Sequence, residues 1–470
     1  MTEPAQNRPV VTITRRGADR LRNGHVWVYR SDVVETTDVS RGALVSVAER
    51  SDKGFRSTQG SPDDSSAALK GERRPRSNSL RAAPPHARVL GTALYSSASE
   101  IALRMVSPKP VGDINKLVRE RIQVAIAYRE RFVRDTNANR VIFSEGDFLP
   151  GLIVDRYNDI LSIQVLTQAM DSDAMREIFI DELKLALQPK AIVERTDARV
   201  RKLEQLPERE SGLIRDSGAR ARPAEDCGAT GGSPVEDHFP TGEAEAANAG
   251  RGRPAPHSQL TTEFQMNDVR FLFDALSGQK TGAFLDQREN YAAAAQYARG
   301  EALDVFCYQG GFALHLAPKC QSVTGVDSSR PALEVAERNA ALNGREIEWI
   351  EANAFDLLRD YSDAGKKYDC VVVDPPAFAK SRRDLPTALR GYKELNLRAL
   401  KMLRPDGILI TCSCSYHVGP SDLLETVSAA ALDSRRIVRV LENRGQAKDH
   451  PNVLSIPETA YLKCLILAVS

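Results

Sequence analysis

The sequence has few of the features that mark a secreted or membrane-bound chain. Only seven of its 470 residues are cysteine, an odd number without the paired spacing of a disulfide framework or a zinc knuckle. No apolar run approaches the roughly 20 residues that span a bilayer, and the N-terminus lacks the apolar core of a signal peptide. A formal net charge of +1 excludes a uniformly basic chain. We therefore expect a cytoplasmic protein that binds no membrane and carries any basic face on one part only.

Two stretches also lack the periodic apolar residues of packed structure. Residues 51–86 are rich in Ser, Arg, Pro and Asp, and residues 207–258 are rich in Gly, Ala, Glu, Pro and Arg. Neither has enough large apolar side chains to offset the entropy of ordering, so both are predicted to be disordered insertions. Arginine clusters at 73–76 and 251–254 could contact RNA phosphates, but a solvated low-complexity loop is the simpler interpretation.

Three ordered blocks surround these insertions. Residues 1–107 contain short alternating segments typical of a small all-β unit, which the first insertion interrupts. Residues 108–275 predict an α+β unit with helices over 114–135 and 173–187, a turn at 157–159 and strands over 191–194 and 269–273. Residues 276–470 alternate strands and helices in the rhythm of a doubly wound, mostly parallel α/β sheet.

A cofactor site is indicated at the start of the last block. Residues 303–312 predict a strand, a turn with Gly310 and Gly311, and a helix, a geometry that brings backbone N–H groups close to a ligand. The next predicted strand ends in Asp327, about 20 residues on, where a carboxylate can bind ribose hydroxyls. NAD and S-adenosylmethionine both satisfy this geometry.

Two later strands add polar groups at the same sheet edge. Asn353 is predicted to end a short strand from residue 348. Asp374 follows an apolar strand and precedes Pro375, Pro376 and Phe378. The prolines stiffen the chain, so the carboxylate and the aromatic ring would be held at the ligand-binding edge. Such a pair suits a flat nucleobase, which can be hydrogen-bonded and stacked at once.

The predicted strand over 408–415 supplies a thiol. A cysteine between small hydroxyl residues at a strand end can act as a nucleophile when its pKa is lowered. Alternation places Cys412 and Cys414 on the same face, so periodicity alone does not choose between them.

With these residues in place, the sequence resembles the bacterial 23S ribosomal RNA cytosine-C5 methyltransferases that carry an N-terminal PUA domain. The most specific match is the string of residues 280–288, Lys-Thr-Gly-Ala-Phe-Leu-Asp-Gln-Arg. Further ordered matches lie at residues 22–29, 91–96, 145–157, 194–197, 390–396 and 449–451. The resemblance implies a Rossmann-like class I methyltransferase sheet after a PUA-like β domain and an α+β middle domain. It also implies S-adenosylmethionine as cofactor and 23S ribosomal RNA as partner.

The resemblance assigns site residues as well. It selects Cys414 as the nucleophile, because the family's Thr-x-Ser-Cys-Ser motif puts its cysteine there. Asp374 is the second catalytic residue, and Pro375, Pro376 and Phe378 contact the substrate base. Asn353 departs from the family, which usually has an acid near the adenine. The residues expected to bind the cofactor are Phe306, Tyr308, Gly310, Gly311, Asp327, Asn353, Asp286, Gln287 and Arg288.

The mechanism we expect begins with addition of the Cys414 thiolate to C6 of cytosine, while Asp374 hydrogen-bonds N3 and the exocyclic amine and Phe378 stacks on the flipped base. C5 then accepts the methyl group, and loss of the C5 proton expels the thiol; no residue is assigned as the base. The alternatives are methylation of a base nitrogen, an inactive RNA-binding ribosome-assembly factor, and a dehydrogenase. We also expect that two copies can associate as a homodimer.

Overall fold

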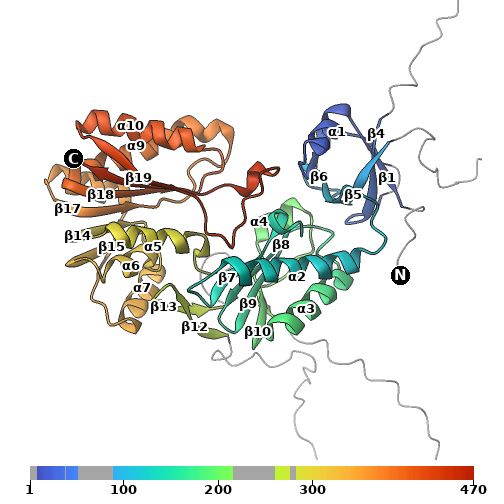
Figure 1. Cartoon of the computed structure of the whole chain (residues 1–470), viewed down its shortest axis with the longest axis horizontal. Coiled ribbons are helices and arrows are strands. Elements are labelled where there is room, and N and C mark those ends of the chain that lie inside the picture. Colours follow the sequence, from blue (N-terminus) through green and yellow to red (C-terminus); the bar gives the residue numbers. More distant parts are fainter. Residues whose placement is uncertain (1–7, 37–38, 51–87, 215–259, 276–281) are drawn as a thin grey trace, which may run out of the picture.

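A computed structural model describes residues 8–36, 39–50, 88–214, 260–275 and 282–470 of the chain. These residues form three units in chain order, each built on its own β-sheet (Figure 1). The first predicted insertion and most of the second lie outside the described residues, together with both arginine clusters. Among the described residues, no helix is long and apolar enough to cross a membrane.

The N-terminal unit is a six-stranded sheet in the order β2-β6-β5-β4-β1-β3. Its strands are β1 (Val10–Ile13), β2 (Trp27–Tyr29), β3 (Val33–Thr36), β4 (Leu44–Glu49), β5 (Val89–Tyr95) and β6 (Ile101–Ser107). Strands β4 and β5 pair across the first insertion, as expected for one interrupted unit. The prediction of an all-β unit was wrong in one respect, because helix α1 (Arg15–Arg22) follows β1. Its arginine-rich sequence offers too few apolar residues for a periodic signal.

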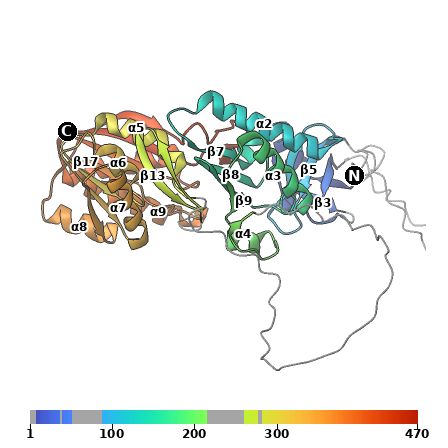
Figure 2. The ribbon, with the colours of Figure 1, turned by 90° about the horizontal axis from the view of Figure 1, so that it is seen from below.

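The middle unit is a five-stranded sheet in the order β11-β10-β9-β8-β7. Its elements are α2 (Ile114–Phe132), β7 (Ala138–Phe143), β8 (Leu152–Tyr157), β9 (Ile160–Val165), α3 (Asp173–Leu187), β10 (Ala191–Glu194), α4 (Ala198–Leu203) and β11 (Gly212–Leu213). Helices α2 and α3 lie side by side and pack on the sheet through one apolar core (Figure 2).

The predicted elements of this unit are largely confirmed. Helix α3 and strand β10 have the predicted bounds, and β8 and β9 meet at the predicted turn, where Asn158 has a φ of 54°. Helix α2 begins at the predicted residue but ends at Phe132, earlier than residue 135, because Val133 is already extended, with φ −97° and ψ 130°. Strand β11 pairs with β10 inside the stretch predicted to be disordered, so the ordered chain extends to residue 214.

A hairpin of β12 (Thr261–Met266) and β13 (Val269–Asp274) joins the middle and C-terminal units. Strand β13 confirms the strand predicted over 269–273. Tyr157 of β8 stacks on Phe273 with ring centroids 3.9 Å apart, and Phe264 and Phe271 share one apolar core with Phe312 of the C-terminal unit. The hairpin therefore ties the two sheets together.

The C-terminal unit is a seven-stranded sheet in the order β16-β15-β14-β17-β18-β20-β19. Its strands are β14 (Glu301–Val305), β15 (Ser322–Asp327), β16 (Glu348–Glu351), β17 (Tyr368–Val373), β18 (Leu403–Ser413), β19 (Val438–Arg444) and β20 (Lys463–Val469). Its helices are α5 (Arg288–Tyr297), α6 (Gly311–Leu316), α7 (Arg330–Leu342), α8 (Ala354–Asp363), α9 (Leu385–Met402) and α10 (Pro420–Ser434). The first five strands in the chain run parallel, and β20 runs antiparallel to β18 and β19. The predicted doubly wound α/β sheet is confirmed.

Helices cover both faces of this sheet. Helices α5, α6 and α7 lie on one face, and α9 and α10 lie on the other (Figure 1). Helix α8 packs into the same core as α9 and α10. Successive residues of β17 explain why the strand is apolar throughout: Cys370 and Val372 enter the first core, while Val371 and Val373 enter the second. The carboxyl ends of the parallel strands therefore meet at one edge, the place where such folds bind ligands.

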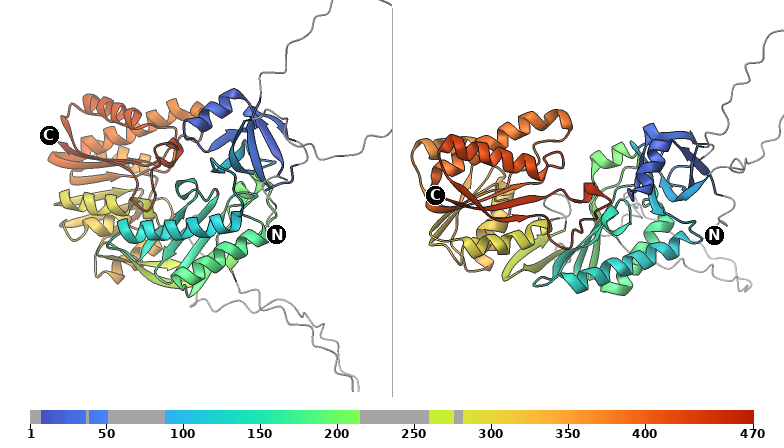
Figure 3. Two further views of the ribbon diagram at one scale, coloured as in Figure 1. Left: turned by 45° about the vertical axis from the view of Figure 1, so that its right-hand side comes forward. Right: turned by 45° about the horizontal axis from the view of Figure 1, so that its top comes forward.

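A segment between β19 and β20, residues 445–462, reaches from the C-terminal sheet to the N-terminal unit (Figure 3). Ile456 is fully buried in the apolar core of the N-terminal unit, and His25 Nε2 lies 3.1 Å from a carboxylate oxygen of Glu458. We call residues 445–462 the arm. It fixes the N-terminal unit with respect to the C-terminal sheet.

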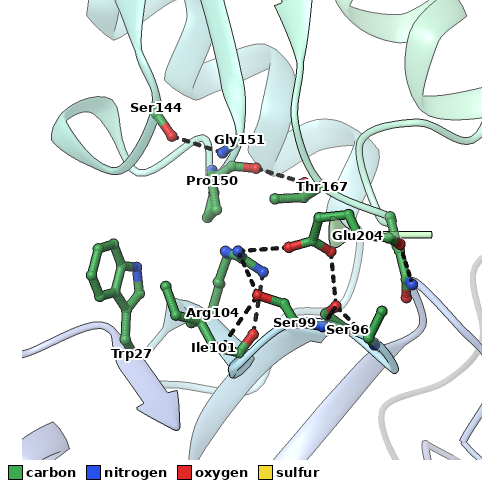
Figure 4. Close-up of polar contacts among 12 residues, drawn as sticks. Trp27, Ser96, Ser99, Ile101, Arg104, Ser144, Pro150, Gly151, Thr167 and Glu204 are labelled. Carbon is green, nitrogen blue, oxygen red and sulfur yellow. Dashed lines mark hydrogen bonds and ion pairs between the residues drawn. The ribbon is translucent and has the colours of Figure 1, made fainter. Parts of the chain in front are cut away.

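The N-terminal unit is also fixed to the middle unit by a buried polar network (Figure 4). Arg104 of β6 pairs with Glu204 of the middle unit at 2.9 Å, and the Ser96 hydroxyl donates to the same carboxylate at 2.8 Å. The Trp27 indole N–H donates to Glu145 at 3.2 Å. Buried charges are stable only when paired in this way, so the network specifies one docking geometry.

Candidate active site

The glycine turn between β14 and α6 has the strained backbone of a ligand-binding loop. Phe306, Tyr308 and Gly310 have φ values of 67°, 49° and 86°. Asp304, at the buried end of β14, accepts a hydrogen bond from the Ala313 amide at 2.8 Å and so anchors helix α6. Non-glycine residues adopt positive φ at an energetic cost that usually has a functional reason.

Asp327 lies at the end of β15, beside this turn. One carboxylate oxygen accepts a hydrogen bond from the Tyr308 amide at 2.9 Å, and the other accepts from the Ser329 amide at the same distance. The Asp327 side chain is only partly buried, so a ligand can still contact its carboxylate. The predicted pairing of the glycine turn with Asp327 is therefore present in the structure.

Asn353 reaches the same edge, but it does not end a strand as predicted. Strand β16 ends at Glu351, and Asn353 caps helix α8. Its side-chain oxygen accepts from the amides of Phe355 and Asp356 at 2.9 Å and 3.3 Å. Capping occupies the oxygen, so the N–H groups of the side-chain amide are what Asn353 can offer to a ligand. The acid that is usual in the family has no such donors.

Residues 286–288 lie where a 3-10 turn (Leu285–Gln287) leads into helix α5, and their side chains have different partners. Lys280 and Thr281 of the same string lie outside the described residues. Asp286 accepts a hydrogen bond from the Tyr461 hydroxyl at 2.6 Å. The Gln287 amide donates to Asp374 at 3.0 Å. Arg288 is 1% exposed and is ion-paired with Asp449 at 3.4 Å, so its guanidinium is committed to a buried structural pair. A cofactor-binding role for Arg288 stays a prediction.

Asp374 follows β17 and carries a perturbed carboxyl group. Burial raises its pKa to about 7, the negative charge of Asp286 acts in the same direction, and the hydrogen bond from Gln287 partly opposes them. Near neutral pH this carboxyl group exists in both forms, so it can donate a hydrogen bond as well as accept one.

The residues after Asp374 lead away from the sheet edge. Pro375 is buried and Pro376 is exposed. The Phe378 ring is partly exposed and packs against Tyr392 and Phe355, with ring centroids 4.9 Å and 5.9 Å away. Phe378 is thus held by two aromatic rings.

The structure separates the two candidate cysteines, which periodicity could not. Cys412 lies within β18, is fully buried and pairs in register with Cys464. Burial raises the pKa of the Cys412 thiol well above its usual value, which leaves it a poor nucleophile. Cys414 lies beyond the end of the strand and is partly exposed, with Sγ 4.0 Å from the Pro375 carbonyl oxygen. Cys414 and Asp374 therefore meet at one edge.

Three residues that the sequence did not single out hold this site together. Ser413 and Ser415 are the residues on either side of Cys414. The Tyr392 hydroxyl accepts a hydrogen bond from the Ser413 hydroxyl at 2.9 Å and lies 3.2 Å from the Ser415 hydroxyl. Tyr461 binds Asp286, and Lys463 binds the Ser415 carbonyl oxygen. A signal for Lys463 existed, since it is a lone cation at the start of the otherwise apolar strand β20.

A cavity lies beside the β12–β13 hairpin. It has a volume of about 500 Å³ and is lined by the β12–β13 hairpin, Gln309 and residues of α7 such as Arg338. It does not include Asp327, Asp374 or Cys414, so it is not the place where the thiol and the carboxyl group meet.

The residues of the edge fit S-adenosylmethionine. The turn of positive φ opens helix α6, Asp327 offers carboxylate oxygens suited to ribose hydroxyls, and Asn353 offers amide donors suited to adenine ring nitrogens. The partly exposed Phe306 ring lies in the same turn.

Comparison with known proteins also points to S-adenosylmethionine as the cofactor. Residues 255–467 match the family model of S-adenosylmethionine-dependent methyltransferases, and residues 11–54 match that of PUA-like domains. The ribosomal RNA large subunit methyltransferase I of Shewanella denitrificans is 36% identical over 392 residues, covering 81% of this chain and 88% of the relative. The enzyme of the same name from Tolumonas auensis is 35% identical over 386 residues, covering 80% and 87%.

Solved structures support the fold. A methyltransferase in complex with S-adenosylhomocysteine superposes with a TM-score of 0.70 at 15% identity, over 98% of this chain and 99% of that one. An S-adenosylmethionine-dependent methyltransferase from Streptococcus mutans gives a TM-score of 0.69 at 15% identity with the same coverage. At this identity the likeness concerns the fold alone.

Proposed function

The chain belongs to the ribosomal RNA large subunit methyltransferase I family, and we propose that it methylates C5 of a cytosine in 23S ribosomal RNA through a covalent adduct with Cys414. It is an S-adenosylmethionine-dependent methyltransferase with a PUA-like N-terminal domain. The proposal concerns the atom that is methylated and the residues that activate it.

One observation carries the proposal: the structure brings a thiol and a carboxyl group of raised pKa to one point of the sheet edge. Cys414 Sγ lies 4.0 Å from the carbonyl oxygen of Pro375, the residue after Asp374. Carbon 5 of cytosine is a weak nucleophile, and a thiolate that adds to C6 turns C5 into an enamine carbon. Methylation of a base nitrogen needs no such thiol.

The residues of this site would act as follows. The Cys414 thiolate forms a bond to C6, and the electron pair of the C5–C6 double bond moves toward C5 and N3. Asp374, whose pKa of about 7 keeps a protonated fraction near neutrality, donates a hydrogen bond to N3 and stabilises the activated ring. Loss of the C5 proton after methylation restores the double bond and expels the thiolate.

The cofactor would be held by the glycine turn with Phe306, Tyr308, Gly310 and Gly311, by Asp327 and Asn353, and by the 286–288 segment. Bound there, S-adenosylmethionine supplies the methyl group. Pro375, Pro376 and Phe378 would contact the target base, with Phe378 kept in place by Tyr392 and Phe355. The PUA-like unit, docked by the arm and by Arg104, would hold RNA at a fixed distance from Cys414.

Identification of the methylated nucleoside tests the proposal. Ribosomal RNA from cells that lack this protein would be incubated with the purified chain and S-adenosylmethionine, digested to nucleosides and analysed by mass spectrometry. We expect 5-methylcytidine and no product from the Cys414→Ala variant. A methylated guanosine or adenosine, with full activity in the Cys412→Ala/Cys414→Ala double variant, would instead establish base-nitrogen methylation.

The remaining expectations need separate measurements. Failure to bind S-adenosylmethionine in calorimetry would favour an inactive assembly factor. Association as a homodimer and a cytoplasmic location stay predictions, which sedimentation and cell fractionation would test.

A further inference from the structure

A lysine is buried beside the proposed nucleophile. Lys463 opens strand β20 and is 6% exposed. Its Nζ donates hydrogen bonds to the Ser415 carbonyl oxygen at 2.6 Å and to the Tyr461 carbonyl oxygen at 2.8 Å. Its backbone is paired with Ser413 in the β18–β20 ladder. The lysine is therefore attached to the residues on both sides of Cys414.

The positive charge of the buried Lys463 ammonium needs a partner. A buried ammonium is costly unless an anion lies close to it. Both hydrogen-bond acceptors of Lys463 are neutral carbonyl oxygens, which orient the ammonium without neutralising it. The groups that interact with it electrostatically are Cys414 and Asp422 of helix α10. Of these two, Cys414 lies between the residues that Lys463 holds.

We propose that the Lys463 ammonium is the positioning residue that keeps Cys414 ionised, so that the nucleophile is a thiolate before the RNA base arrives. The inference rests on the proposed function, because it concerns the same cysteine. A thiol that loses its proton to solvent beside a fixed cation gains the attraction between the two charges. The bond to Ser415 also fixes the loop, which aims Sγ at the site.

The titration of Lys463 agrees with this geometry. Burial lowers its pKa to about 8, and the charges of Cys414 and Asp422 act in the opposite direction. At pH 7 the side chain is therefore still mostly an ammonium. Other titratable groups also lie near Cys414: Tyr392 on α9, Asp374 after β17, and Tyr416 and His417 in the loop that follows the cysteine. Burial raises the pKa of both Tyr392 and Asp374, so neither of these two supplies a positive charge, whereas Lys463 does.

The test measures the thiolate fraction of Cys414 directly. The full chain is alkylated with iodoacetamide between pH 6 and pH 10, and modification of the Cys414 peptide is followed by mass spectrometry. In the wild type we expect the midpoint of reactivity to lie below the roughly 8.5 of an unperturbed thiol. In Lys463→Met we expect it to rise by about one pH unit, with alkylation at pH 7 slowed roughly tenfold.

Two further variants separate charge from structure. Lys463→Arg keeps the cation, so its midpoint should stay within about half a unit of the wild type. Lys367→Met is the matched control, because Lys367 Nζ also binds a backbone carbonyl, that of Lys401, at 2.6 Å on the exposed surface. This control should behave like the wild type in alkylation and in methyl transfer.

The outcomes distinguish this inference from the proposed function. A wild-type midpoint at or above 8.5 overturns the role of Lys463, even if Lys463→Met fails to fold. An unchanged midpoint in a folded Lys463→Met variant also overturns the role of Lys463. In that case an inactive Cys414→Ala variant would still support the adduct mechanism. Conversely, a depressed midpoint that depends on Lys463, together with full activity of Cys414→Ala, supports the ion pair and contradicts the proposed nucleophile.

Discussion

Substitution of Asp374 by asparagine should stabilise the folded chain at alkaline pH and leave it nearly unchanged at acidic pH. The pKa of this carboxyl group is raised from 3.8 to about 7 in the folded protein, mainly by burial. A raised pKa favours folding fully below 3.8, and this contribution is lost as the pH rises through 7. Asparagine does not titrate, so it does not suffer the loss.

The magnitude follows from the shift. Each unit corresponds to about 1.4 kcal/mol, so ionisation between pH 5 and pH 8.5 would cost the wild type about 3 kcal/mol if the whole shift applied. Asp374 is partly exposed at the site, and solvent screens its charge. We therefore expect about 1.5 kcal/mol: the advantage of Asp374→Asn in unfolding free energy should grow by that amount over this range.

The assay is urea unfolding at pH 5, 6, 7 and 8.5. The chain contains two tryptophans, and in a Trp27→Phe background the fluorescence of Trp349, on β16, reports the C-terminal unit. Asp363→Asn is the control, because the Asp363 side chain is 64% exposed. Its difference from the wild type should not change with pH.

A flat profile would refute this reasoning. If the difference between Asp374→Asn and the wild type stays constant within about 0.3 kcal/mol from pH 5 to pH 8.5, the folded pKa of Asp374 is ordinary. The carboxyl group would then be fully ionised at neutral pH and could not donate to N3 as proposed.

Two further substitutions test the cofactor turn and the arm. Gly310 has a φ of 86°, and a Cβ added there would lie 2.8 Å from the Trp349 ring, so Gly310→Ala should distort the turn. Calorimetry should then show an S-adenosylmethionine affinity at least about tenfold lower than that of the wild type. Gly344→Ala is the control, because Gly344 also has a positive φ but a Cβ added there meets no atom within 4 Å, and this variant should bind S-adenosylmethionine normally. In Ile456→Ala, loss of a fully buried side chain should destabilise the N-terminal unit by roughly 2–5 kcal/mol, whereas Leu454→Ala, at a 95% exposed position, should change its stability by less than about 0.5 kcal/mol. Urea unfolding followed by the fluorescence of Trp27, on β2, in a Trp349→Phe background measures both.

Much of the fold could be predicted because the spacing of apolar residues along each segment indicates its helices and strands. Helix α3 keeps its apolar residues on one face and has the predicted bounds, and strand β15 ends in Asp327 as predicted. Helix α1 escaped prediction because its sequence is almost entirely polar and its stability comes from the Thr14 cap and from packing.

The site was predictable only in part, for a related reason. Asp327 ends a parallel strand, and Asp374 and Cys414 each come directly after one, so topology alone brings the three residues to one edge. The partners of these residues come from distant segments. Lys463 reaches Ser415 from 48 residues away, and Arg288 is committed to Asp449 rather than exposed to a ligand. Periodicity carries no information on such pairings, and it could not distinguish Cys412 from Cys414.

The most direct test of the central claim is covalent trapping on RNA that contains 5-fluorocytidine. Fluorine at C5 cannot leave as a proton does, so an enzyme that works through C6 addition stays attached to its substrate. Cys412 is fully buried, so both the wild type and the Cys412→Ala variant should form an adduct that survives denaturing electrophoresis. The Cys414→Ala variant should form none. An adduct with Cys414→Ala, or none with the wild type, would contradict the account.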